Sequence, residues 1–529
     1  MNTELLNNNY AFNYKPVQLI LPLEVEVISP ADDVVHSFVE LMKGFNLSKY
    51  ITRSYHRGNQ GYDPTMMLLV ILFAYTNQIY SLRKIEQACK TDIRFMSLCN
   101  MKTPSHNAFA TFINENLVDK NIENIFYDIN KYIISCDDSI DTSKLYIDGT
   151  KFEANAKKTS FVWRKAVEKF QQKLFTNVST FIVEYNKCYD QYFPVKNKYK
   201  STYLKTIVED IEINIKKQKI EFVYGKGSRK HDLQRKHEKI NDYYSRLAKY
   251  EEHFKIFENR NSYSKTDHDA TFMHMKYDYY NNTGVFKPGY NIQVGVSSEY
   301  IMVADIFQCA NDLRTFIPLM DLYKSKYKSY PQYPVGDAGY GSFENYKYCK
   351  EHNMELTLKY PLFNKVNFDK TFVKKKKYQA INFKTSENGF KICPENQEFN
   401  VLISENIIDV NGYGKKQYKY ECTKCNDCPV KSECTKAAGN RMITVTPELE
   451  EMYKKVNENL TGDFGSNLRK QRSIQAEGTF GIIKQDYQYT RIHRKKIENV
   501  KTELLLICIG YNIKKYHNKK SRIKLNWYI

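Results

Sequence analysis

Hydrophobic positions recur at helical spacing through the first quarter of the chain. The segment SPADDVVHSFVELMKGF (29–45) carries acidic residues in its first turns and predicts a helix. The segment DPTMMLLVILFAY begins with Asp63 before Pro64, the order of an N-cap residue followed by proline at the first helical position. We therefore predict a helical domain over residues 62–140.

A further helix is predicted within this domain, over TPSHNAFATFINENL, where Thr103 and Pro104 repeat the same arrangement. Its apolar residues form one stripe: Phe109, Phe112, Ile113 and Leu117. Its first turn is small and polar and contains His106 and Asn107, as in helices that enter a DNA groove from a helix-turn-helix-like unit. A helical packing domain with a solvated helix start is the alternative, and the pattern favours neither.

Strand patterns begin at KLYIDGTKFEANA (144–156), which predicts a short strand ending at Asp148 and Gly149. Two strands, a helix and two further strands are predicted at 289–298, 300–309, 311–327, 333–342 and 354–361. This order is typical of a mixed α/β sheet, which we assign to residues 141–160 and 265–361.

Between these two parts of the sheet, residues 161–264 are strongly helical. Apolar residues recur every seven positions, and aromatic residues follow three later, which gives an a/d seam: Leu233, Ile240, Leu247, Phe254, Tyr243, Tyr250 and Phe257. The turn YGKGSRK (224–230) divides the region into two arms, so we predict a coiled-coil-like helical hairpin inserted into the sheet. Core helices of one larger domain are the alternative.

Three further segments complete the predicted organisation. Residues 1–61 are irregular outside the first predicted helix, and residues 362–460 form a β-rich, lysine-rich insertion that contains a cysteine cluster. Residues 461–529 are helical and basic, and we predict that they complete the α/β core.

The charge of the chain points to a polyanionic partner. The 529 residues carry a formal net charge of +20, which suits nucleic acid or, as a distant alternative, an anionic membrane surface. The longest apolar runs, 66–74 and 504–510, fall short of the roughly 20 residues that a membrane span needs. The N-terminus has no basic start followed by an apolar stretch, so we expect an intracellular protein whose cysteines are free thiols or metal ligands.

Three acidic residues stand where catalytic chemistry is often found. Asp148 and Asp337 close predicted strands in YIDGTK and VGDAGYG, and Glu477 lies on the predicted helix IQAEGTFGIIKQ. Carboxylates that converge at a sheet edge repel each other unless a cation holds them, and Mg²⁺ prefers such oxygen ligands. Two such ions can activate a water or a 3′-hydroxyl and stabilise the leaving oxygen of a phosphodiester. An isolated Asp before Gly is more often a turn residue, and it is the conjunction of the three acids that favours a catalytic role.

The surroundings of these acids suit a phosphate ligand. Small residues beside the two aspartates leave room for a phosphate to approach: Gly149, Ala338, Gly339 and Gly341. Lys484 follows Glu477 by nearly two helical turns and therefore shares its face. We predict that Glu477 binds metal while Lys484, with Arg472 upstream, holds a phosphate.

The blocks YIDGTK, VGDAGYGS and RSIQAEGTFGIIKQ, in this order, resemble the three acidic blocks of DDE transposases of bacterial insertion sequences, in the subgroup with a helical N-terminal domain and a late cysteine cluster. The segments 62–99, 265–276 and GYNIQVGV resemble other blocks of that subgroup, so that the resemblance covers most of residues 60–515. In the last block Lys484 matches the family pattern. Arg472 lies five residues before Glu477 instead of four, and Arg469 stands where a tyrosine is usual.

The resemblance implies an RNase H-like core in which Asp148, Asp337 and Glu477 bind two Mg²⁺ (or Mn²⁺) ions. It implies a transposase that cuts the terminal inverted repeats of its own element and joins them to target DNA, working as a dimer on double-stranded DNA in the cytoplasm, at the nucleoid. The expected DNA contacts are Lys484, Arg472, Lys151, His106, Asn107, Arg491 and Arg494. The alternatives are an RNase H-like nuclease without strand transfer and an inactive, transposase-derived DNA-binding repressor.

Other acids could compete for these roles. Asp267 and Asp269 form a D-x-D pair that we interpret as part of a supporting loop beside the site. Asp305 and Asp312 are weaker candidates of the same kind.

The segment CTKCNDCPVKSEC places Cys422, Cys425, Cys428 and Cys434 in one compact loop. Four thiolates at this spacing suit a tetrahedral Zn²⁺ site that folds a small β-insertion beside KKKK (374–377), and Cys393 could replace one of the four. An iron–sulfur cluster and four unligated thiols are the alternatives. The cysteines in apolar helices, such as Cys89, Cys99 and Cys508, are predicted to be core residues.

Overall fold

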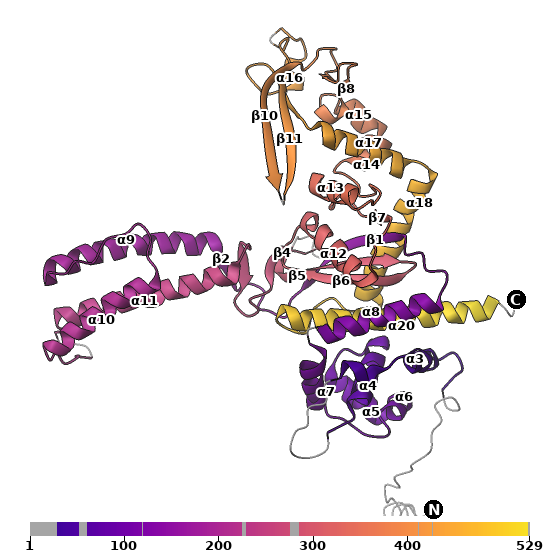
Figure 1. Cartoon of the computed structure of the whole chain (residues 1–529), viewed down its shortest axis with the longest axis horizontal. Helices are drawn as coiled ribbons and strands as arrows, with labels where there is room; N and C mark the ends of the chain where they lie inside the picture. Colours follow the sequence, from indigo (N-terminus) through magenta and orange to yellow (C-terminus); the bar gives the residue numbers. More distant parts are fainter. Residues whose placement is uncertain are drawn as a thin grey trace, which may run out of the picture. The chain divides into compact units, whose positions relative to one another are not determined.

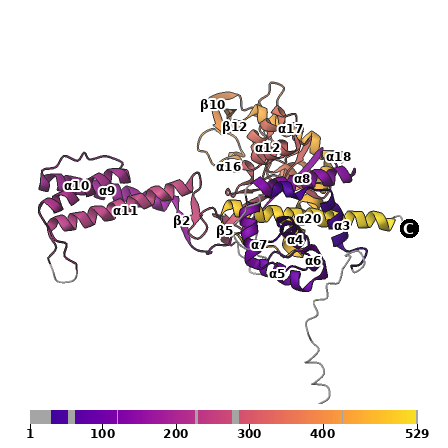
Figure 2. The same ribbon diagram turned by 60° about the horizontal axis from the view of Figure 1, so that its bottom comes forward.

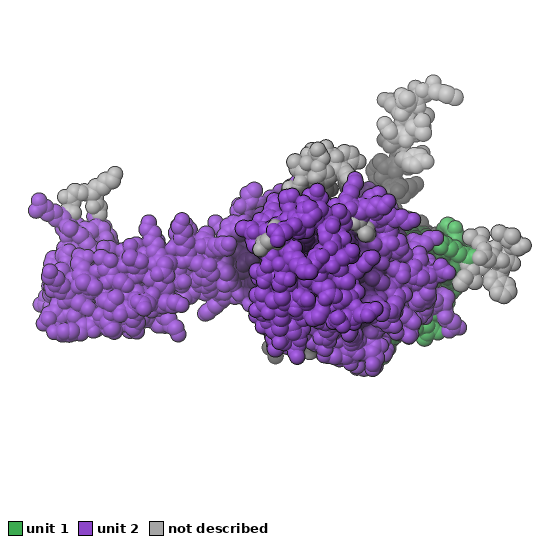
Figure 3. All heavy atoms as spheres, turned by 90° about the horizontal axis from the view of Figure 1, so that it is seen from above, with its two compact units in different colours: residues 1–137, 505–529 green, residues 138–504 purple. Residues whose placement is uncertain are grey.

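The structure, a computed structural model, describes residues 29–51, 61–118, 120–224, 229–275, 285–410, 412–425 and 427–526. The chain divides into two units, which Figure 3 colours separately: residues 1–137 with 505–529, and residues 138–504. In the described part of the chain, no helix is both long enough and apolar enough to cross a membrane.

The first unit is helical. It contains α3 (Val34–Lys43), η1 (Leu47–Tyr50), α4 (Pro64–Thr76), α5 (Leu82–Thr91), α6 (Ile93–Leu98), α7 (His106–Phe112), η2 (Ile113–Leu117), α8 (Lys120–Cys136) and the C-terminal part of α20 (Ile497–Asn526). The predicted N-cap of α4 is confirmed, because the Asp63 carboxylate accepts hydrogen bonds from the backbone N–H groups of Thr65 and Met66. Gly510 of α20 packs so closely on α4 that a Cβ there would lie 2.5 Å from the Tyr75 carbonyl oxygen.

The start of α7 differs from the prediction by two residues. The helix begins at His106 and its N-cap is Ser105, whose hydroxyl accepts a hydrogen bond from the Ala108 N–H. Thr103 and Pro104 precede the cap because the Ser105 hydroxyl, two residues closer to the apolar stripe, satisfies a free N–H group of the first turn.

The second unit contains a mixed sheet, consistent with the predicted α/β class. Its strands are β1 (Lys144–Glu153), β4 (Thr271–His274), β5 (Phe286–Ser297), β6 (Tyr300–Phe307) and β7 (Tyr333–Val335). β5 pairs antiparallel with β1 along one edge and with β4 and β6 along the other, and β7 pairs parallel with β1. The helices η3 (Asp312–Arg314) and α12 (Phe316–Tyr327) connect β6 to β7, and α13 (Phe343–Glu351) follows β7 (Figure 1).

Two details of the predicted sheet are corrected. β1 continues to Glu153, so Asp148 lies in the middle of a strand instead of at its end. Gly149 is a strand residue whose missing side chain makes room for Gln293 of β5, since a Cβ there would meet the Gln293 Nε2 atom at 2.0 Å. The strand predicted at 354–361 is reduced to one parallel bridge between Gly336 and Leu358.

The helical insertion has three helices instead of the predicted hairpin. A short ladder of β2 (Phe161–Trp163) and β3 (Ser262–Ser264) closes its base, and α9 (Arg164–Tyr189), α10 (Ser201–Lys217) and α11 (Asp232–Phe257) lie side by side in Figures 1 and 2. α9 ends at Asp190, which has a left-handed backbone conformation. The predicted seam of α11 is largely confirmed, because Leu233, Ile240, Tyr243 and Leu247 are buried in the core shared by the three helices.

The remainder of the second unit is built from short strands and helices. It contains α14 (Phe363–Phe368), α15 (Lys370–Lys375), η4 (Ala380–Asn382), β8 (Lys384–Thr385), β9 (Lys391–Ile392), β10 (Val401–Val410), β11 (Tyr413–Glu421), α16 (Lys431–Cys434), β12 (Met442–Val445) and α17 (Pro447–Thr461). β10, β11 and β12 form one antiparallel sheet, and β8 pairs with β9. A helix that alternates between α-helical and π-helical turns follows: α18 (Asp463–Arg472), η5 (Ser473–Glu477), α19 (Gly478–Gly481) and η6 (Ile482–Asp486).

Candidate active site

The three predicted acids lie on neighbouring elements. β1 and β7 are adjacent parallel strands, which brings Asp148 of β1 close to Asp337, two residues beyond the end of β7. The helix that carries Glu477 packs on the same strands, through contacts of α18 with β1 and β7 and of η5 with β1 and β5. Residues far apart in the sequence thus meet at one edge of the sheet.

The Arg472 side chain joins the three carboxylates. Its Nη1 atom lies 2.7 Å from an oxygen of Glu477, and its Nη2 atom lies 2.9 Å from Asp148 and 3.7 Å from Asp337. Its Nε atom donates a hydrogen bond to the Ile147 carbonyl oxygen at 3.3 Å. The guanidinium is buried, and it is the common partner of all three acids.

The spacing of Arg472 and Glu477 has a structural explanation. The helix between them widens into the π-helical turn η5, in which hydrogen bonds run from one residue to the fifth residue beyond. Two residues five apart therefore share a face, as residues four apart do in an α-helix. The family pattern of four residues and the observed five place the same two groups side by side.

Burial and charge shape the titration of this cluster. Burial raises the pKa of Asp148 to about 6; Arg472 opposes this effect, while Asp337 and Glu477 add to it. Burial also lowers the pKa of Arg472, but the three carboxylates outweigh it and leave that pKa above its usual value. Asp337 and Glu477 are more accessible, with side chains 45% and 50% exposed, so the site opens to solvent on their side.

Lys484 lies on the same face of β1 as Asp148. Its ammonium group donates hydrogen bonds to the Thr150 hydroxyl at 2.6 Å and to the Lys151 carbonyl at 3.3 Å, and it lies 4.6 Å from the centre of the Phe152 ring. Because side chains alternate along a strand, Thr150 shares the face of Asp148 and the Lys151 side chain points to the other face. The expected DNA contact of Lys151 remains a prediction, and it would involve that other face.

One residue near the site, Lys359, was not predicted. Burial lowers the pKa of Lys359, and the charges of Arg472 and Arg469 lower it further, which identifies Lys359 as a neighbour of the acid cluster. A Cβ on Gly339 would lie 2.9 Å from a carboxylate oxygen of Asp337 and 3.6 Å from one of Asp312, so both acids lie close to that glycine. The lysine lacked a local signal because it lies within 354–361, where the predicted strand is reduced to one bridge.

The other acids have structural partners. Asp312 accepts hydrogen bonds from Asn291 and Gln293 at 2.7 and 2.9 Å, and Asp305 pairs with Lys501 at 3.2 Å. Asp267 accepts a hydrogen bond from the Tyr290 hydroxyl at 2.7 Å.

In the D-x-D pair, Asp269 accepts a hydrogen bond from the Ile497 N–H at 2.9 Å, at the first residue of α20. This arrangement agrees with the supporting loop expected for Asp267 and Asp269.

Most of the remaining predicted DNA contacts have partners of their own. In the first unit, His106 is half-buried and donates its backbone N–H to Glu86 at 2.9 Å, while Asn107 is exposed. In the second unit, Arg491 lies 3.7 Å from Glu153 and is about half exposed, and the Arg494 N–H donates to Glu503 at 2.9 Å. Contacts of these residues with DNA remain predictions.

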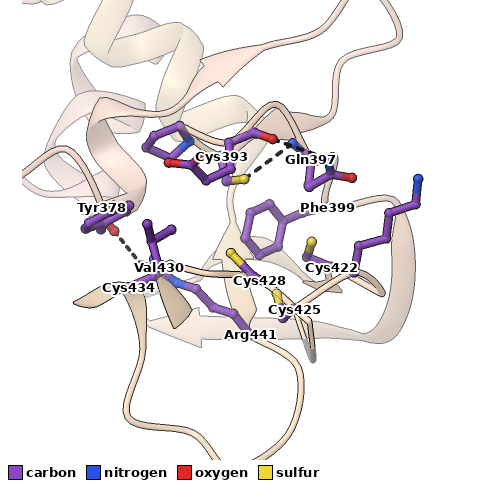
Figure 4. Close-up of a pocket in the computed structure, with 13 residues that line it drawn as sticks. Tyr378, Cys393, Gln397, Phe399, Cys422, Cys425, Cys428, Val430, Cys434 and Arg441 are labelled. Atoms are coloured by element: carbon purple, nitrogen blue, oxygen red, sulfur yellow. Dashed lines mark hydrogen bonds between the residues drawn. The ribbon is translucent and has the colours of Figure 1, made fainter. Parts of the chain in front are cut away.

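The cysteine cluster forms one site with a fifth thiol. Cys393, Cys422, Cys425, Cys428 and Cys434 all line a small cavity of about 20 Å³, shown in Figure 4. Across the described residues, no three His, Cys, Asp or Glu side chains stand in the arrangement of a formed metal site, and this applies to the thiols and to the acids. Cys89 and Cys508 are buried in helices, as predicted, and Cys99 is buried at the C-cap of α6.

Two segments match known protein families. Residues 392–517 match the family described as Transposase DDE domain, and residues 24–115 match the Transposase domain (DUF772). The curated proteins and the solved structures gave no match. The matches identify the chain as a DNA transposase. The matches support the resemblance of its acidic blocks to those of the DDE transposases of bacterial insertion sequences.

The two matches cover different candidate residues. The first contains Arg472, Glu477 and Lys484 together with all five clustered cysteines, and the second contains the start of α7. Asp148 and Asp337 lie outside both, so their assignment rests on the geometry around Arg472.

Proposed function

We propose that this transposase cuts the ends of its insertion sequence and joins them to target DNA, with Asp148, Asp337 and Glu477 as the metal-binding catalytic residues. One observation carries the proposal. The acids are separated by 337 − 148 = 189 and 477 − 337 = 140 residues, and yet one buried guanidinium lies within 3.7 Å of all three.

The sheet supports an RNase H-like core. β1, β5 and β6 form an antiparallel meander, and β7 then lies parallel to β1 on its free edge. Asp148 lies on β1 and Asp337 lies two residues beyond the end of the adjacent parallel strand β7, and the family resemblance implies neighbouring positions on the sheet for the first two acids.

The acid cluster suits hard divalent cations. Three carboxylates and one guanidinium carry −3 + 1 = −2 charges when all are ionised, and oxygen ligands are those that Mg²⁺ or Mn²⁺ prefers. Bound Mg²⁺ would supply activation of the attacking water or 3′-hydroxyl and stabilisation of the leaving oxygen. The chain itself positions the acids, and Arg472 keeps them together against their mutual repulsion.

The surface around the acids suits a DNA backbone. A Cβ added at Gly478 or Gly481 would meet nothing within 4 Å, so the helix beside Glu477 leaves space for a phosphate. Lys484 and Arg472 would provide positive charge in that space, and Lys151, His106, Asn107, Arg491 and Arg494 would add further DNA contacts. Two element ends must be cut together, so we propose a dimer on DNA, acting at the nucleoid.

The test uses the purified full-length protein, Mg²⁺ and duplex DNA that carries the ends of the element. Asp148→Asn should bind this DNA as the wild type does and lose metal-dependent strand cleavage, because one ligand charge is removed without a change in size. Asp305→Asn is the matched control, since this acid pairs with Lys501 and does not contact Arg472 in the structure. Cleavage by Asp148→Asn at the wild-type rate would overturn the assignment.

A joining assay separates the proposed activity from its alternatives. A pre-cut element end with a free 3′-hydroxyl should be joined to target DNA by the wild type. Cleavage without joining would indicate a nuclease, and DNA binding without either reaction would indicate a repressor.

A further inference from the structure

Five thiols from two separate segments share the small cavity of Figure 4. Cys393 lies in the turn after β9, whereas Cys422, Cys425, Cys428 and Cys434 follow β11. A tetrahedral zinc site takes four thiolates, so one of the five must lie outside it. The contacts of the individual thiols distinguish the fifth.

Cys393 lies in a hydrogen-bonded turn. The Cys393 N–H donates to the Gln397 carbonyl at 2.9 Å, and the Gln397 N–H donates back to the Cys393 sulfur at 3.3 Å. Asn396 closes the turn with a φ of +56°. These two hydrogen bonds hold the Cys393 sulfur in place within the turn.

Cys393 also faces the other thiols. It packs against the small core that holds Cys422 and Cys425, together with Phe383 and Phe399. In Figure 4 the thiols of Cys393, Cys422, Cys425 and Cys428 gather around the Phe399 ring. These four come from both segments, so that a shared ion would tie the two segments together.

Cys434 has a different partner. Its sulfur accepts a hydrogen bond from Arg441 Nη1 at 2.7 Å, on the Tyr378 side of the pocket. Arg441 is held in place by the Tyr378 carbonyl oxygen at 2.7 Å and by the Phe383 ring, whose centre is 5.1 Å away. A guanidinium in contact with a ligand sulfur would repel a divalent cation at the same sulfur.

We propose that Cys393, Cys422, Cys425 and Cys428 bind one structural Zn²⁺ ion, and that Cys434 is the fifth thiol, paired with Arg441. This set differs from the one predicted from the loop alone, which contains Cys434. The cavity of about 20 Å³ has room for one sphere of the size of a water molecule. Bound zinc would require these side chains to turn toward that space, since a Zn–S bond is about 2.3 Å long.

A structural ion explains how this part of the chain holds together. The buried apolar core under β10, β11 and β12 consists of Phe383, Phe399, Cys422, Cys425, Ile443 and Val445, and two of these are the thiols themselves. Cores this small are commonly supplemented by a metal, whose binding then contributes directly to folding. The proposal does not depend on the transposition reaction, because metal retention is measured without DNA.

The experiment measures zinc in the full-length protein, purified with reductant and then dialysed. Wild type and Cys434→Ser should each retain one zinc per chain, and Cys393→Ser should lose it. Cobalt-loaded wild type should show the absorption of a four-thiolate tetrahedral site. Retention of zinc by Cys393→Ser with loss by Cys434→Ser would overturn the proposed set, and iron with labile sulfide in place of zinc would overturn the metal.

A second measurement on the wild type avoids variants that fail to fold. Alkylation followed by mass spectrometry should leave Cys393 protected in the zinc-loaded protein and reactive after chelation. The exposed Cys136 and Cys188 should react equally in both states and serve as internal controls. Equal labelling of Cys393 with and without zinc would contradict the proposal.

Discussion

Arg472 and Glu477 lie five residues apart and are joined by an ion pair of 2.7 Å, because the helix between them adopts a π-helical turn. The turn is tied to the sheet, since the same guanidinium reaches Asp148 on β1 at 2.9 Å. The local winding of the helix and the convergence of the acids are therefore parts of one arrangement. π turns of this kind are frequent at functional sites.

The stability of a protein that lacks Arg472 should depend more strongly on divalent metal than that of the wild type. In Arg472→Met the buried Asp148 carboxylate loses its cation, which should cost about 3 kcal/mol of unfolding free energy without metal. The figure is at the low end for a broken buried pair because Asp337 and Glu477 are about half exposed. Mg²⁺ should restore much of this loss, so thermal unfolding with and without Mg²⁺ should show a larger metal-induced shift than in the wild type.

Arg469→Met is the matched control for that experiment. Arg469 donates to the Leu460 carbonyl at 3.0 Å and lies 4.5 Å from the centre of the Phe368 ring, away from the acids. Its metal-induced shift should equal that of the wild type. Equal shifts in all three proteins would show that Arg472 does not occupy the metal-binding cluster.

Two glycines near the acids should respond oppositely to alanine. A Cβ at Gly341 would lie 2.1 Å from the Lys359 carbonyl oxygen, so Gly341→Ala should destabilise the protein by about 1–3 kcal/mol. Gly481 is helical with open space beside it, so Gly481→Ala should stabilise by roughly 0.5–1 kcal/mol. Urea unfolding of both variants measures the difference, and the reverse order would contradict the packing described here.

The start of α7 should depend on pH through Glu86. Hydrogen bonds from the Lys90 ammonium and then from the His106 backbone and ring lower the pKa of Glu86 from 4.5 to about 2. A carboxylate whose pKa is lowered in the folded state contributes its full stabilisation at pH values above its ordinary pKa of 4.5. This contribution is lost as the pH falls toward about 2. The protection of the His106 amide against hydrogen exchange, corrected for the intrinsic rate, should therefore decrease over this interval.

The Ala108 amide is the internal control, because it donates to the Ser105 hydroxyl, which does not titrate in this range. Glu86→Gln should remove the pH dependence at His106 and leave Ala108 unchanged. A parallel loss of protection at both amides would indicate general unfolding of the helix instead.

Local patterns predicted the parts of the fold that depend on neighbours in the sequence. Asp63 before a proline predicted a helix cap, and the seven-residue repeat of Leu233, Ile240 and Leu247 predicted the buried seam of α11. Strand-forming residues around Asp148 placed that acid on the sheet, although β1 extends five residues beyond it. The break after α9 was missed, and Pro194 was its available signal.

Features that depend on tertiary contacts were beyond the sequence patterns. The spacing of Arg472 fits only when a π turn replaces an α turn, and that turn coincides with an ion pair to a strand 324 residues away in the sequence. Cys393 lies outside the compact cysteine loop, and only the fold brings it into the same cavity while Arg441 takes Cys434. The neighbourhood of Lys359 depends in the same way on side chains from α18.

The most direct test of the central claim is metal-dependent cleavage by Asp148→Cys, with Asp148→Ala as control. Sulfur is a poor ligand for Mg²⁺ and a better one for the softer Mn²⁺. If Asp148 binds the catalytic metal, Asp148→Cys cuts the element end with Mn²⁺ and not with Mg²⁺, whereas the wild type uses both and Asp148→Ala uses neither. Equal cleavage by Asp148→Cys in the two metals, or cleavage by Asp148→Ala, would contradict a metal site built on Asp148, Asp337 and Glu477.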